Sequence, residues 1–74
     1  MKITKVSRHI RYVAFLSPVN HRYYVKREIH TVSGQWMASP SVVWPCENQD
    51  AASRLCDKQA ALERHLRKEL AGCT

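Results

Sequence analysis

The chain lacks the features that mark secreted, membrane-spanning or disordered proteins. Its longest apolar run, Tyr12 to Leu16, is far shorter than the roughly 18 residues that cross a membrane. No apolar segment of the signal-peptide kind follows the charged N-terminus. Two glycines and three prolines are too few for a low-complexity segment. We therefore expect residues 1–74 to form a single domain in the cytoplasm, without a membrane partner.

Cysteine and histidine are present, but not at the spacings typical of metal sites. Cys46, Cys56 and Cys73 include no closely spaced pair, and the four histidines form no metal-binding repeat. We expect the thiols to stay reduced, with Cys56 packed in the core. Cys46 is followed by Glu47, which disfavours a reactive thiolate. These patterns predict no metal site.

Motifs of enzyme active sites are also missing. The chain has no G-x-S-x-G elbow, no phosphate-binding glycine loop and no H-E-x-x-H pair. Its six carboxylates show no paired arrangement suited to general acid–base chemistry. We therefore expect a protein that is not an enzyme and carries no cofactor.

Positive charge is concentrated in the first part of the chain. Residues 1–30 contain seven lysines and arginines and one carboxylate, whereas residues 31–74 contain five of each sign. A field of one sign accelerates association with an anionic partner and selects among partners. The asymmetry favours a phosphate backbone or an acidic protein surface as the partner, although surplus cations can also serve solubility alone.

Alternating polar and apolar residues predict antiparallel strands in the first half of the chain. Residues 10–17, 22–32 and 35–38 read as strands joined by turns, and residues 41–44 read as an extended edge segment between prolines. In the second strand, Tyr23 and Val25 fall on one face, and Tyr24 and Lys26 fall on the other.

Residues 48–72 predict one amphipathic helix. Asn48 or Asp50 can cap its start, and Gly72 stands where a helix commonly ends. Its apolar stripe consists of Ala52, Leu55, Leu62, Leu66 and Leu70.

Together these elements predict an α+β fold, an antiparallel three- to four-stranded β-meander followed by one C-terminal α-helix, with a basic sheet over residues 1–45. The expected core comprises Leu55, Leu62, Leu66, Val13, Phe15, Val25 and Trp44. On that basis Leu62→Ala would cost about 2–5 kcal/mol of stability. Trp36 is expected beneath the helix with Trp44, or alternatively as an exposed anchor beside a turn.

The basic hairpin is the candidate binding site. Its cations suit phosphates or acidic side chains, and its rings can stack on bases or fill protein pockets. The alternative is a solvated outer face with no partner. The candidate residues are Lys5, Arg8, Arg11, Arg22, Tyr23, Tyr24, Lys26 and Arg27.

Two resemblances bear on function. The order of elements is similar to that of the AP2 and integrase arm-binding domains and of double-stranded-RNA-binding domains. Asp50 to Ser53 stand where the helix of the last group opens with a lysine cluster. The start Met1 to Val6, the stretch Tyr12 to Pro18 and the chain length resemble the RNA-polymerase-binding regulators of Xanthomonas lytic phages.

The phage resemblance implies a monomer in the host bacterial cytoplasm that binds the N-terminal region of the polymerase β′ subunit. It also implies inhibition of sigma-dependent initiation and promotion of antitermination. Direct DNA or RNA binding through the same basic face is the first alternative. A small inhibitor of the anti-CRISPR type, which has the same size and architecture, is the second.

Overall fold

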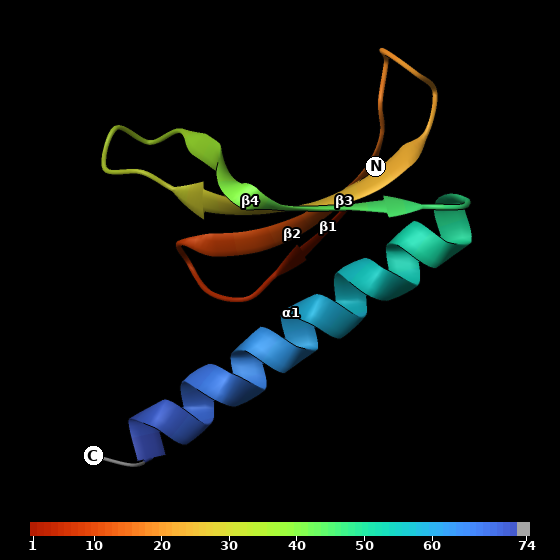
Figure 1. Ribbon diagram of the computed structural model, residues 1–74. Coiled ribbons are helices and arrows are strands. Elements are labelled where there is room, and N and C mark those ends of the chain that lie inside the picture. The colour runs from red at the N-terminus through yellow and green to blue at the C-terminus, as the bar shows by residue number, and fades with distance from the viewer. Residues whose placement is uncertain (73–74) are drawn as a thin grey trace.

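The computed structural model describes the backbone of residues 1–72 and the side chains of residues 1–38 and 43–68. Its elements are β1 (Lys2–Lys5), β2 (Ile10–Leu16), β3 (Tyr23–His30), β4 (Trp36–Cys46) and α1 (Gln49–Gly72). The strands form one antiparallel sheet in chain order, and α1 lies across one face of it (Figure 1). The predicted α+β fold, a meander followed by a C-terminal helix, is confirmed.

Strand boundaries differ from the predictions in two places. The predictions did not include β1, because four residues with alternating lysines give a weak strand signal. β1 pairs with β2 at one edge of the sheet. The predicted strand 35–38 and edge segment 41–44 belong to one strand, β4. Pro40 and Pro45 are tolerated there because β4 is the other edge strand, where a missing N–H need not break a ladder.

The core between the layers is built from small helix residues and large sheet residues. Ala52, Cys56 and Ala60 follow one another at four-residue spacing and are almost completely buried. Small side chains let the helix axis approach the sheet, and Tyr12 and Val25 fill the remaining space. Asn48 caps the helix as predicted, because its Oδ1 accepts a hydrogen bond from the Ala51 N–H at 2.8 Å.

The predicted leucine stripe does not face the sheet. Leu62 and Leu66 are 47% and 56% exposed, so their placement in the core was wrong. At about 100° per residue, Leu62 lies roughly 200° around the axis from the buried Ala60. Towards its C-terminal end α1 also diverges from the sheet (Figure 1). Leu55 alone of the described leucines packs against the core; the Leu70 side chain and Cys73 lie outside the described residues.

A register shift gives the two tryptophans opposite sides of the sheet. Lys26 pairs with Val43, but Glu28, two residues later, pairs with Ala38. Between these two pairs β3 advances by two residues and β4 by five. Because one number is even and the other odd, the alternation of side chains along β4 reverses across the shift. Trp44 packs against the core as predicted, whereas Trp36 lies on the face away from α1.

Candidate binding face of the sheet

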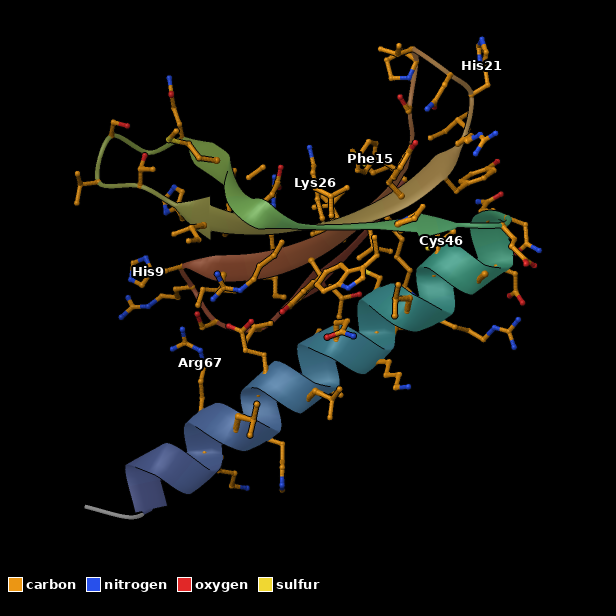
Figure 2. All side chains as sticks on the ribbon, viewed as in Figure 1. His9, Phe15, His21, Lys26, Cys46 and Arg67 are labelled. Carbon is orange, nitrogen blue, oxygen red and sulfur yellow. The ribbon has the colours of Figure 1, made fainter. Side chains whose placement is uncertain are left out.

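The sheet has one face that α1 does not cover, and we call it the open face. The cross-strand register arranges its side chains in rows. One row contains Lys5, Arg11, Glu28 and Ala38, the next contains Ile3, Val13, Lys26 and Val43, and the third contains Phe15, Tyr24 and Pro45. Trp36 and His30 pair at the far end of β3. Figure 2 shows Phe15 and Lys26 projecting from the sheet on the side away from α1.

A buried carboxylate holds two cations at the centre of this face. Glu28 is 6% exposed; the Arg11 Nε donates to its Oε1 at 2.7 Å, and the Lys26 Nζ lies 3.1 Å from its Oε2. Burial raises the pKa of Glu28, but the hydrogen bonds from Arg11 and Lys26 outweigh it and hold that pKa below its ordinary value. Two cations on one carboxylate leave an excess of positive charge, to which Lys5 adds.

The first aromatic cluster lies at the His30 end of β3. The Arg11 guanidinium carbon is 4.1 Å from the Trp36 ring centroid, a cation–π contact. The His30 and Trp36 ring centroids are 4.8 Å apart, and the His9 ring stacks on His30 at 6.3 Å. This end of the open face therefore presents three ring systems and a guanidinium plane.

The second aromatic cluster lies at the opposite end of the open face. The Phe15 and Tyr24 rings stack with centroids 6.0 Å apart, and the Lys26 ammonium sits 4.8 Å from the Phe15 centroid. Tyr24 is fixed further because its hydroxyl accepts a hydrogen bond from the Asn20 side-chain amide at 2.8 Å. Val13, between the clusters, is only 2% exposed although no helix covers it, so its neighbours pack tightly.

The structure divides the eight predicted site residues among three locations. The open face carries Lys5, Arg11, Tyr24 and Lys26. Arg8 and Arg22 are exposed in the connections that precede β2 and β3. The helix-facing side carries Tyr23 and Arg27. The predicted placement of Tyr24 beside Lys26, away from Tyr23, agrees with the register.

Several prominent residues of the open face were not among the predicted site residues. Phe15 was predicted in the core beneath the helix, which was wrong, because it pairs with Tyr24 on the open face. It follows Arg11 and Val13 at two-residue spacing, and that alternation was a usable signal. Trp36 could not be assigned to this face from the sequence, because its side depends on the register shift in β4. His9 precedes His30 by 21 residues, and His30 precedes Trp36 by six. The pairing of the strands brings these rings together, so their clustering is a tertiary effect.

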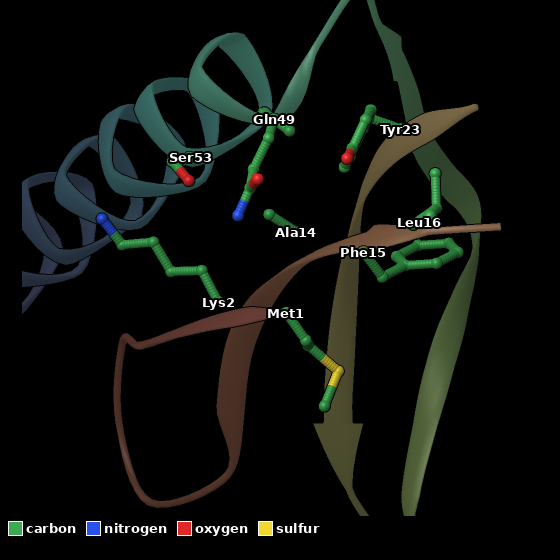
Figure 3. A pocket seen from close by; sticks show the side chains of 9 residues that line it. Met1, Lys2, Ala14, Phe15, Leu16, Tyr23, Gln49 and Ser53 are labelled. Atoms are coloured by element: carbon green, nitrogen blue, oxygen red, sulfur yellow. The ribbon is translucent and has the colours of Figure 1, made fainter. Parts of the chain in front are cut away.

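Two of the clefts in the described part of the chain lie where the sheet meets the start of α1. The smaller, of about 220 Å³, lies between the N-terminus, the end of β2 and the start of α1 (Figure 3). It is lined by Met1, Lys2, Ala14, Phe15, Leu16, Tyr23, Gln49, Ala52 and Ser53. The larger, of about 390 Å³, is lined by His21, Arg22, Tyr23, Pro45, Cys46 and Glu47. Burial raises the pKa of the Cys46 thiol in this second cleft, which disfavours the nucleophilic thiolate.

Other kinds of site find little support in the described part of the chain. Within it, no group of three or more His, Cys, Asp or Glu side chains is arranged to hold a metal ion. Its helix is not long and apolar enough to cross a membrane. Comparison of the chain with protein-family models, with curated proteins and with solved structures gave no match.

Proposed function

We propose that this protein is a non-catalytic regulator that binds bacterial RNA polymerase through the open face. The observation that carries the proposal is an uncovered sheet face on which cations alternate with partly exposed rings. The polymerase, and its β′ N-terminal region in particular, is proposed from the resemblance to phage regulators. Inhibition of sigma-dependent initiation, antitermination and action as a monomer in the host cytoplasm belong to the same proposal.

The composition of the open face suits a protein or nucleic-acid interface. Trp, Tyr and Arg are the residue types that most often dominate binding energy at interfaces. Arg11 and Lys26 are already held in place by Glu28, so they lose little conformational freedom when a partner arrives. Pre-organised cations beside partly exposed rings favour binding as the role of this face.

Lys5 and Arg22 are the best positions at which to test electrostatic recognition. Among the described side chains, no carboxylate forms an ion pair with either of them. Their charges are therefore available to a partner, and their reversal breaks no internal pair. Reversal of Lys26 would instead place a second carboxylate beside Glu28 and damage the fold.

The experiment is capture of core RNA polymerase by tagged protein at physiological salt. The double variant Lys5→Glu, Arg22→Glu should lose about tenfold or more in affinity. The matched control is Lys58→Glu, Lys68→Glu, which changes the net charge equally but alters exposed positions on α1. The control should bind and inhibit promoter-dependent transcription like the unmodified protein. No capture of polymerase by the unmodified protein, or equal loss in both variants, would refute the proposal.

A further inference from the structure

The two aromatic clusters of the open face stand at opposite ends of a cationic track. Tyr24 and His30 are six residues apart on β3, which corresponds to about 20 Å along an extended strand. Arg11 and Lys26 lie between the clusters, and Lys5 lies beside Arg11 on β1. The order along the track is therefore rings, cations, rings.

We propose that this track binds a short single strand of nucleic acid, with bases stacked at both ends and phosphates over the cations between them. The inference rests on the proposed function, since the proposed partner is a machine that handles nucleic acid. A span of about 20 Å fits the short end of the site sizes, roughly 4–16 nucleotides, of sheet-based single-strand binders.

Ring chemistry favours a single strand over a duplex. Stacking on a protein ring needs the flat face of a base, which a single strand exposes and a duplex conceals between neighbouring pairs. The Arg11 guanidinium covers Trp36, and a guanidinium plane is itself a surface on which bases stack. Phe15 and Tyr24 provide a second stacked platform, already fixed by the hydrogen bond from Asn20.

Charge complementarity favours the same ligand. Glu28 is the one carboxylate among the described side chains of the open face, and both of its oxygens are occupied by Arg11 and Lys26. A phosphate approaching from solvent therefore meets the cations rather than the carboxylate. An acidic protein segment would also be attracted, but it would leave the two ring platforms without flat partners.

The first measurement is fluorescence anisotropy of a labelled, unstructured oligo-uridine or oligo-thymidine of about eight nucleotides. The unmodified protein should bind it saturably, and affinity should fall with salt with a logarithmic slope of about −2 if three phosphates are neutralised. A hairpin duplex of equal charge should bind at least about tenfold more weakly. Equal affinity for the duplex, or no saturable binding at low salt, would overturn the inference.

The second measurement uses a tryptophan as reporter. In the variant Trp44→Phe, Trp36 is the sole tryptophan, and a base stacking beside it should quench its emission along the same titration curve. Trp36→Leu and Phe15→Leu should each weaken oligonucleotide binding about tenfold, whereas Lys58→Glu, Lys68→Glu should not. Equal loss in the helix control would show unspecific electrostatics and refute the site.

The two proposals fail separately. Polymerase capture without oligonucleotide binding would overturn the single-strand site, leave the polymerase proposal intact and assign the face to protein recognition. Oligonucleotide binding without polymerase capture would overturn the polymerase proposal and support the strand site. Ring variants that abolish oligonucleotide binding while leaving polymerase capture unchanged would support the strand site and would contradict the use of these rings in the polymerase contact.

Discussion

The Arg27 guanidinium on the sheet donates two hydrogen bonds to the Glu63 carboxylate on α1. Its Nε lies 2.7 Å from Oε1, and its Nη2 lies 3.0 Å from Oε2. The Tyr12 hydroxyl donates to Oε1 at 2.7 Å, and the Arg67 Nε donates to Oε2 at 3.2 Å. This network joins the two layers near the point where the helix leaves the sheet. Arg27, predicted as a partner-binding residue, contributes here to the fold.

The first prediction is that Glu63 makes stability depend on acid pH. The hydrogen bonds from Arg27 lower the pKa of Glu63 from 4.5 to about 2. A carboxyl with a depressed pKa stabilises the fold above its unfolded-state pKa, and that contribution disappears as pH falls from about 4.5 to 2. Since one pKa unit corresponds to about 1.4 kcal/mol, the contribution at neutral pH is roughly 3 kcal/mol.

Glu63→Gln should therefore destabilise the protein at neutral pH, and its difference from the unmodified protein should shrink towards pH 2. Urea unfolding followed by circular dichroism at several pH values measures this. Asp57→Asn is the control, because the Lys2–Asp57 pair is about half exposed and solvent screens it. A Glu63→Gln difference that stays constant between neutral pH and pH 2 would contradict the prediction.

The second prediction concerns which face of α1 is packed. Because Leu62 is half exposed, Leu62→Ala should change the free energy of unfolding by no more than about 0.5 kcal/mol. Ala60 is fully buried against the sheet, so Ala60→Leu should cost about 1–3 kcal/mol by overpacking. Thermal melts of the two variants give the comparison. A larger loss in Leu62→Ala than in Ala60→Leu would show that the leucine stripe faces the sheet.

The helix illustrates what the sequence could and could not specify. Its existence, start and length were predictable, because a capping Asn48 precedes more than twenty residues without proline or glycine before Gly72. Its buried face was not, because hydrophobicity pointed to leucines while packing distance selected Ala52, Cys56 and Ala60. Close approach to a sheet that already carries Tyr12 and Trp44 leaves no room for large side chains.

The third prediction follows from the register shift in β4. Trp44 packs against the core, whereas Trp36 lies on the open face. In Trp36→Phe the remaining Trp44 should emit at shorter wavelength and resist acrylamide quenching. In Trp44→Phe the remaining Trp36 should emit at longer wavelength and be quenched more readily. Identical spectra and quenching constants in the two variants would place both rings in the same environment.

The open face was only half predictable for the same reason. Alternation in β3 correctly separated Tyr24 and Lys26 from Tyr23, since successive strand residues face opposite sides. The irregular pairing between Ala38 and Val43 reverses that alternation in β4, and no local sequence pattern indicates how many residues a bulge contains. The contacts of Trp36 with Arg11 and His30 therefore depend on the register shift, which the alternation of polar and apolar residues does not predict.

The fourth prediction is that Glu28 positions the cations of the open face. Glu28→Gln removes the anion that holds Arg11 and Lys26, and the change to a buried polar group should cost about 1–3 kcal/mol of stability. The face also gains one net positive charge, which should speed association with an anionic partner at low salt. Arg11 and Lys26 are then no longer pre-organised, so dissociation should accelerate as well.

Surface plasmon resonance on immobilised polymerase, or on the immobilised oligonucleotide, separates the two rates. Lys5→Gln is the comparison, because it removes an unpaired cation and should slow association while leaving dissociation nearly unchanged. An unchanged dissociation rate in Glu28→Gln would show that the carboxylate serves the fold alone and that Arg11 and Lys26 need no support to bind.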